Sequence, residues 1–174
     1  MDPTSGDVIL LLSDVHAHYH VIDAQVAHAE ELIGQPVIQV LVLGDFGLFA
    51  PNLHAYFRRG RRRFLRPVAF IEGNHEDYIA FDDLVRDYAD VVTHLPRASV
   101  QTFGRLRFLC LGGARYMDAW STPPGCEISD QDIARCLALE PGAVDIVLSH
   151  DCPTGIGVDH DRDLGHLGEP GVAV

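Results

Sequence analysis

Side chains that can bind metal ions follow several hydrophobic segments of this chain. Carboxylate oxygens, amide oxygens and imidazole nitrogens, with no thiolate among them, suit manganese, iron, zinc or magnesium better than a soft metal. A single aspartate or histidine after an apolar segment is most simply a loop or capping residue, so the prediction of a metal site rests on their joint occurrence. The candidate ligands are Asp14, His16, Asp45, Asn74 and His150.

The chemistry expected from such a set is phosphoryl transfer. Two divalent ions about 3.5–4 Å apart can clamp a phosphoryl group and generate hydroxide from water. The centre would need a bridging carboxylate, for which Asp45 has two oxygens, and Gly44 before it lets the backbone turn tightly. It would also need a proton donor for the leaving oxygen, and His75 could act as that acid or contact the phosphate. Asp151 could orient a neighbouring ligand.

Buried parallel strands are expected to position these residues. Continuous apolar runs predict strands at 8–12, 37–43, 67–71 and 144–148. Helical spacing of apolar residues predicts helices at 21–33, 53–57 and 77–88. Chemistry in an open α/β sheet lies beyond the carboxyl ends of its strands, so the candidate ligands should converge at one edge of the sheet.

The second half of the chain has a different pattern of predicted elements. Short β segments are predicted at 91–95, 100–103 and 106–111, with Gly104-Arg105 as a hairpin turn between the last two. A helix is predicted at 129–139 with Ser129 as its N-cap, and the tail from residue 155 is predicted as loop. We expect a single α/β domain over residues 1–174.

Composition excludes several classes of protein. No apolar run approaches the roughly 20 residues that cross a bilayer, and the N-terminus lacks the pattern of a secretory signal, so we expect a cytoplasmic protein without membrane contact. The four cysteines form no CxxC pair, which argues against a zinc ribbon. A disulfide framework is not expected in a cytosolic chain of this size. Cys110 is expected to be buried in a strand.

Charge is distributed unevenly. The net charge of −12 argues against a protein that coats nucleic acid non-specifically. All 13 basic residues are arginines, and six of them lie between Arg58 and Arg66. This cluster could be a solvated helix end and loop, or it could steer phosphates or contact nucleic acid.

These motifs resemble those of the calcineurin-like metallophosphoesterases, over residues 10–156. The family's motifs D-x-H, G-D, G-N-H-[DE] and H occur here in order, at Asp14-Val15-His16, Gly44-Asp45, Gly73-Asn74-His75-Glu76 and His150. The resemblance implies an α/β sandwich of two facing sheets with helices outside, of the type α/β-β/α. It also implies that Asp14 and His16 bind one metal, that Asn74 and His150 bind a second, that Asp45 bridges both, and that His75 is the general acid and touches the phosphate.

Two departures from the family pattern stand out. Leu48 occupies the position where G-D-x-x-D would supply an aspartate to support the catalytic histidine. No G-H-x-H motif follows, since Gly165-His166 keeps only its first half. The chain could be C-terminally incomplete and lack its last strands, which we favour. Alternatively, His160 and His166 could serve in a changed arrangement, or one metal site could be incomplete.

Finer features suggest a subgroup and a substrate class. Gly44-Asp45-Phe46 and Gly73-Asn74-His75-Glu76 are similar to segments of RNA lariat-debranching phosphodiesterases and of bacterial metallophosphoesterases with G-D-F-G, the nearer group. We expect two divalent ions, Mn²⁺ first, with iron, zinc or magnesium as alternatives. The expected substrate is a phosphodiester or phosphomonoester, such as a nucleotide or nucleic acid, with His18 and His75 contacting it and Trp120 available for stacking. The alternatives are a phosphoprotein phosphatase and an inactive scaffold that binds proteins.

Overall fold

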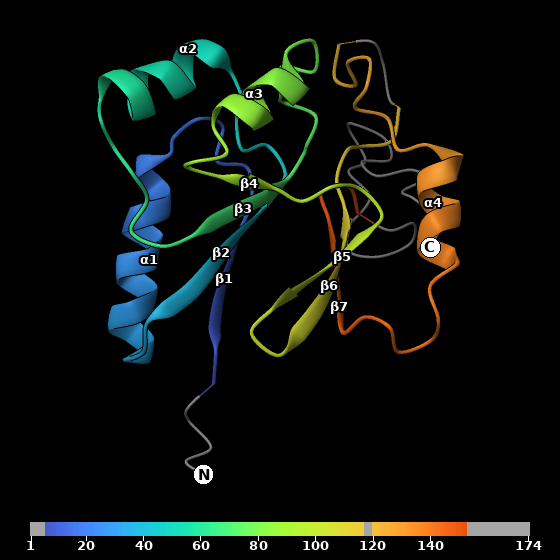
Figure 1. Ribbon diagram of the computed structural model, residues 1–174, viewed down its shortest axis with the longest axis horizontal. Helices are drawn as coiled ribbons and strands as arrows, with labels where there is room; N and C mark the ends of the chain where they lie inside the picture. Colours follow the sequence, from blue (N-terminus) through green and yellow to red (C-terminus); the bar gives the residue numbers. More distant parts are fainter. Residues whose placement is uncertain (1–5, 117–119, 153–174) are drawn as a thin grey trace, which may run out of the picture.

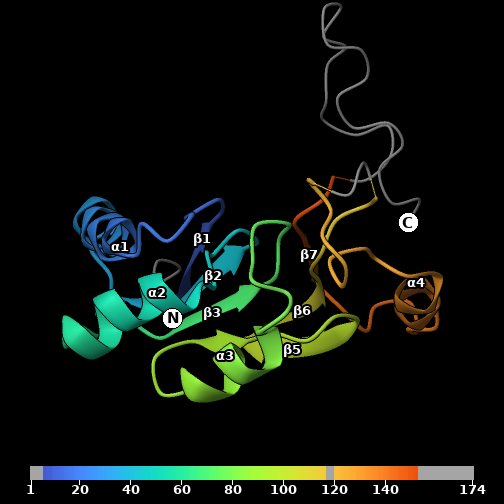
Figure 2. The same ribbon diagram turned by 90° about the horizontal axis from the view of Figure 1, so that it is seen from above.

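Two β-sheets face each other between helices in the computed structural model, which describes residues 6–116 and 120–152 (Figures 1 and 2). The first sheet is parallel, with its strands in chain order: β1 (Val8–Leu12), β2 (Val37–Leu43), β3 (Val68–Ile71) and β4 (Thr93–His94). In the second sheet, β5 (Ser99–Phe103) pairs antiparallel with β6 (Leu106–Leu111), and β7 (Ile146–Ser149) lies parallel to β6. The predicted two-sheet α/β fold is confirmed.

Helices cover the outer sides of this sandwich. The first sheet is covered by α1 (His20–Ile33), by α2 (Ala50–Leu53) with the π-helix η1 (His54–Arg59), and by α3 (Phe81–Asp87). The helix α4 (Asp130–Leu137) lies beyond the second sheet (Figure 2). Ser129 caps α4 as predicted, since its side chain accepts a hydrogen bond from the Asp132 N–H.

The largest differences between predicted and observed boundaries concern three elements. The helix predicted at 77–88 begins only at Phe81, because the Asp77 carboxylate accepts a hydrogen bond from the Ala80 N–H at 3.1 Å and closes a turn first. The helix predicted at 53–57 is longer, since a helical segment spans Ala50 to Arg59 with Pro51 in its first turn. The β segment predicted at 91–95 is reduced to the two residues of β4.

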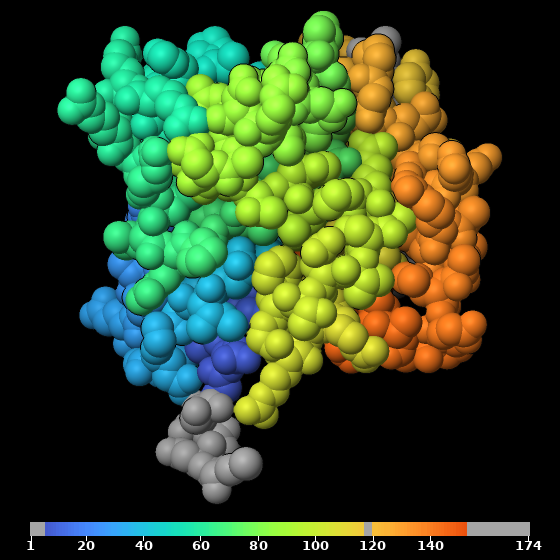
Figure 3. All heavy atoms as spheres, viewed as in Figure 1, coloured from blue at the N-terminus to red at the C-terminus, as the bar shows by residue number. Residues whose placement is uncertain are grey.

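The central strands of the first sheet, β2 and β3, are buried on both faces over most of their length, which explains their continuous apolar runs. Successive side chains of β2 alternate, so Val40 and Val42 pack toward the helices, whereas Leu41 packs toward the second sheet. Cys110 on β6 belongs to this inter-sheet core and is fully buried, as predicted. The space-filling view shows the two halves of the chain, blue to green and yellow to orange, packed side by side (Figure 3).

Two further predictions concern regions outside this core. No helix among the described residues is both long and apolar enough to cross a membrane. The tail predicted as loop, which contains His160 and His166, lies outside the described residues.

A buried ionic cluster joins the end of β3 to the second half of the chain. The Glu72 carboxylate accepts a hydrogen bond from Arg97 and lies 2.8 Å from His94 Nε2. Arg97 also donates to the carbonyl oxygens of Gly125, Cys126 and Glu127. Burial by itself would raise the pKa of Glu72, but the hydrogen bond and charge of His94 and the charge of Arg97 lower it below its ordinary value.

Removal of Arg97 should therefore destabilise the fold. Arg97→Ala would leave the Glu72 carboxylate buried without its main counter-charge, which should lower the free energy of unfolding by about 3 kcal/mol or more in urea titrations. Arg86→Ala removes an arginine whose side chain is 68% exposed and paired with Asp83, and should cost less than about 0.5 kcal/mol. Equal losses from the two variants would contradict this account.

Candidate metal centre

The polar residues that follow the strands converge at one edge of the sandwich. Asp14 follows β1, Asp45 follows β2 and Asn74 follows β3, while His150 comes directly after β7 of the second sheet. The loops after β1 and β2 are joined by backbone hydrogen bonds, from the Asp14 N–H to the Gly44 carbonyl at 3.2 Å and from the His16 N–H to the Asp45 carbonyl at 2.8 Å. The predicted convergence at the carboxyl ends of the strands is therefore observed.

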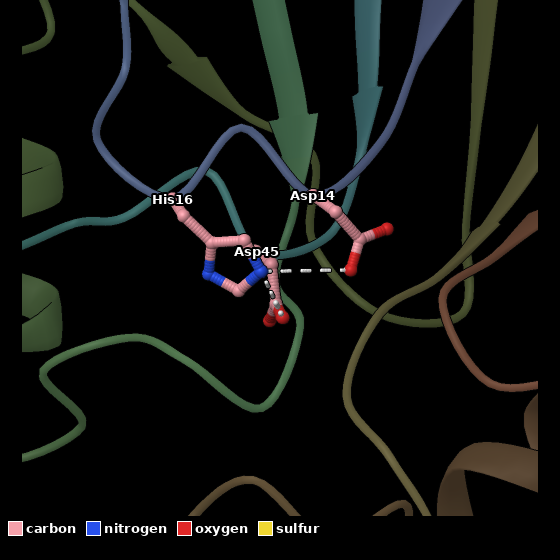
Figure 4. A group of neighbouring side chains, drawn as sticks. All are labelled: Asp14, His16 and Asp45. Carbon is pink, nitrogen blue, oxygen red and sulfur yellow. Dashed lines mark ion pairs between the residues drawn. The ribbon is translucent and has the colours of Figure 1, made fainter.

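Asp14, His16 and Asp45 form the first group of ligand atoms (Figure 4). His16 Nε2 lies 3.7 Å from Asp14 Oδ1 and 3.6 Å from Asp45 Oδ2. The three ligand atoms that these residues offer all lie within 4.8 Å of one another. Asp14 and His16 are exposed, whereas Asp45 is only 2% exposed. One cation could be held here between two carboxylates and an imidazole.

Asp45, Asn74 and His150 form the second group. His150 Nε2 lies 3.0 Å from Asn74 Oδ1 and 3.5 Å from Asp45 Oδ1. His150 Nδ1 lies 2.9 Å from the Leu43 carbonyl oxygen, to which it can only donate. A neutral His150 then has no proton on Nε2, so three acceptor atoms face one another. A cation between them would convert this repulsion into coordination.

The spacing within both groups fits metal ligands. Two ligands that each lie about 2.1 Å from an ion at ordinary coordination angles are separated by roughly 3.0–3.4 Å. The contacts of 3.0 and 3.5 Å around His150 Nε2 match this spacing, and those of 3.6 and 3.7 Å around His16 are slightly wider. Asp45 contributes a different oxygen to each group, which is the arrangement of a bridging carboxylate.

The backbone around the site is strained where the ligands need it. Asp14, His16 and Asp45 have φ values of 55°, 46° and 52°, in the left-handed region that few residues other than glycine adopt. A Cβ at Gly44 would lie 2.2 Å from His150 Nδ1, and one at Gly73 would lie 2.1 Å from Asp45 Oδ1. The glycines of the G-D and G-N-H motifs therefore make room for the ligands of the neighbouring strands.

Glu76 holds the loop that follows Asp45. Its carboxylate is buried and accepts hydrogen bonds from the N–H groups of Phe46, Gly47 and Leu48, the first two at 2.9 and 3.0 Å. Burial raises the pKa of Glu76 to about 8, although these three N–H groups stabilise its charged form. In the sequence, Glu76 was noted only as the last residue of the G-N-H-[DE] motif. Its position directly after Asn74 and His75 was the signal that could have identified it as part of the site.

A family model confirms the resemblance found in the motifs. The model described as calcineurin-like phosphoesterase matches residues 8–174. The chain belongs to the calcineurin-like phosphoesterase family. A search of curated proteins gives no match. Family membership and the Asp14-His16-Asp45 group support binding of a divalent metal and metal-dependent hydrolysis of phosphoesters. The G-D-F-G subgroup and the similarity to lariat-debranching enzymes stay predictions.

Two further residues singled out in the sequence have contacts outside the two ligand groups. His18 is exposed, and its ring packs against His20 with 6.1 Å between centroids, so its contact with substrate stays a prediction. Asp151 accepts a hydrogen bond from the Arg115 N–H at 2.9 Å, whereas His150 donates to the Leu43 carbonyl. That Asp151 orients a neighbouring ligand stays a prediction. The contacts of Asp151 and His150 join chain segments far apart in sequence, which no local pattern reveals.

His75 occupies an exposed position at the rim of the centre. Its backbone N–H donates to Asp45 Oδ1 at 2.8 Å, and its ring meets the His16 ring edge-on at 5.1 Å between centroids. Leu48, at the position where the family often has an aspartate, is fully buried and offers no polar side chain. The ring of His75 is therefore placed by the backbone and by packing against His16.

A loop of the second half also reaches the centre. The Asn74 side-chain N–H donates to the Ser121 carbonyl oxygen at 2.9 Å, which directs Asn74 Oδ1 toward His150. Ser13 donates to the Asp14 carboxylate and thereby orients it. Trp120, adjacent to Ser121, is 88% exposed. Sequence analysis missed the contacts of Ser13 and Ser121 because neither residue forms part of a recognisable motif.

Gly44 provides a test of the geometry around His150. Gly44→Ala should weaken Mn²⁺ binding at least about tenfold in calorimetric titrations, because the new methyl group would displace the imidazole. Gly34→Ala is a matched control, since Gly34 also has a positive φ of 72° but a methyl group added there would meet no other atom within 4 Å. The control should lose about 1 kcal/mol of stability and keep its metal affinity. Similar metal affinities for both variants would count against the site.

Proposed function

We propose that this chain is a metal-dependent phosphoesterase with two divalent ions, Mn²⁺ foremost, and that it acts on phosphodiesters or nucleotides. The proposal rests on the two Asp45 carboxylate oxygens, which face different ligand groups: Oδ2 lies 3.6 Å from His16 Nε2, and Oδ1 lies 3.5 Å from His150 Nε2. A single carboxylate that faces two ligand groups has the form required for a pair of ions.

The protein residues would divide the work as follows. Asp14 and His16 would hold one ion, Asn74 and His150 the other, and Asp45 both. When bound, such ions stabilise charge on a phosphoryl group and lower the pKa of water. The Leu43 carbonyl keeps the His150 proton on Nδ1, so that Nε2 stays a ligand. The Ser121 carbonyl keeps the Asn74 oxygen turned to the same point.

His75 is proposed as the general acid. Its exposed imidazole stands at the rim of the centre, beside His16, where the leaving group of a bound ester would emerge. A proton on the imidazole could pass to the departing alkoxide oxygen. His75 could also contact a phosphate oxygen in the same position.

Hydrolytic activity should depend on Asp45. Incubation with Mn²⁺ and bis-p-nitrophenyl phosphate should release p-nitrophenol, and chelation of the metal should stop the release. Asp45→Asn should reduce the rate about a hundredfold or more, because the amide keeps one uncharged oxygen and replaces the other with an NH₂ group that cannot bind a metal ion. Release is measured by absorbance. No turnover by the parent with Mn²⁺, iron, zinc or magnesium would instead favour the scaffold alternative.

The role of His75 predicts a dependence on the leaving group. His75→Asn should slow hydrolysis of a methyl phosphodiester by about 10²-fold or more, because the alkoxide needs a proton. The same variant should slow the p-nitrophenyl ester far less, because that leaving group departs as an anion. Measurement of both rates, with His28→Asn as the exposed-histidine control, tests this. An equal loss for both esters would remove His75 from the acid role.

A further inference from the structure

The structure separates the arginine cluster into paired and unpaired members. Arg58 and Arg63 form ion pairs with Asp90 at 2.8 and 2.9 Å, and Arg66 pairs with Glu30 at 2.8 Å. These three arginines fix the end of η1 and the segment after it to neighbouring elements, so the interpretation as a helix end and loop accounts for them. Within residues 6–116 and 120–152, no carboxylate forms an ion pair with the other members, Arg59, Arg61 and Arg62.

One of these unpaired arginines lines a cavity beside the metal centre. The cavity has a volume of about 310 Å³, which lies in the range of small-ligand sites. Its walls include Ala17, which directly follows His16, as well as Asn52, Tyr56 and Arg62. The Ala17 N–H donates to the Phe46 carbonyl at 3.1 Å, so this wall belongs to the loop of Asp14 and His16, which is hydrogen-bonded to the loop that carries Asp45.

Arg62 is placed by an aromatic ring and not by a carboxylate. Its guanidinium carbon lies 4.8 Å from the centre of the Tyr56 ring. Stacking of this kind covers one face of the guanidinium and leaves its N–H edges available for a planar, bidentate contact with a phosphate. The Asn52 side chain adds an amide donor to the same cavity.

The charge of the whole chain makes this position distinctive. A protein of net charge −12 repels polyanionic substrates at a distance. Arg62 is a cation without an acidic partner among the described residues, in a cavity whose wall includes Ala17 next to His16, so it offsets this repulsion locally. The other unpaired arginines, Arg59 and Arg61, do not line the cavity.

We propose that this cavity binds a second phosphate group of the substrate through Arg62, so that the enzyme prefers esters with a phosphate besides the one that it cleaves. Short oligonucleotides and nucleoside bisphosphates have this chemistry. The inference rests on the proposed function, because it names the substrate class of the same centre.

A matched pair of substrates tests the preference. Thymidine 5′-(p-nitrophenyl phosphate) and its 3′-phosphorylated form differ only in the second phosphate. With Mn²⁺, the parent should show a KM about tenfold lower for the phosphorylated form, as expected for one charge-assisted contact. Arg62→Ala should abolish this difference in KM and leave the KM of the unphosphorylated ester within about twofold of the parent value. Arg59→Ala, which removes an exposed unpaired arginine outside the cavity, should retain the difference in KM. Equal KM values in the parent, or equal losses in both variants, would overturn the proposal.

A binding measurement separates this inference from the proposed activity. Calorimetry in the presence of Mn²⁺ compares adenosine 3′,5′-bisphosphate with adenosine 5′-monophosphate. The bisphosphate should bind about tenfold more tightly to the parent and to Arg59→Ala, and no more tightly than the monophosphate to Arg62→Ala. If no ester is hydrolysed but this pattern holds, the hydrolase proposal fails and the phosphate site stands. Equal affinities of the parent for both nucleotides would overturn the site itself.

Discussion

The Asp45 carboxylate is the constraint on which the rest of the centre depends. It is almost completely buried, and among the described residues its one hydrogen-bond donor is the backbone N–H of His75. Each of its oxygens faces a histidine nitrogen from a different side, His16 and His150. A buried charge with so little compensation from the protein is costly unless cations neutralise it. The site is thus built around positive charge that the side chains themselves do not supply.

Two buried glutamates hold the G-N-H motif in place beside the Asp45 carboxylate. Glu72, before the motif, is anchored to Arg97 and His94 and so to the second half of the chain. Glu76, after the motif, binds three N–H groups of the loop that follows Asp45. The segment between them cannot move without disturbing either the inter-sheet cluster or the neighbouring loop. This rigidity keeps Asn74 within 3.0 Å of His150, although 76 residues separate them in the chain.

The distribution of cations shows how one sequence cluster acquires two roles. Arginines that find Asp90 or Glu30 become structural, because pairing fixes their side chains and neutralises their charge. Arg62 instead stacks on Tyr56 in the wall of a cavity, where we propose that its charge meets a phosphate group of the substrate. Nothing in the run from Arg58 to Arg66 distinguishes these cases, since each residue has the same side chain and similar neighbours.

The parallel sheet, the order of its elements and the residues that meet at its edge could be predicted from the sequence. This was possible because strand periodicity is local and because parallel strands bring their carboxyl ends together whatever their loops contain. Tertiary structure alone decided the partners: Leu43 for His150, Ser121 for Asn74, Arg115 for Asp151, and Glu76 for the loop after Asp45. These contacts join residues tens of positions apart, so they follow from packing and hydrogen-bond geometry that no neighbouring letters encode.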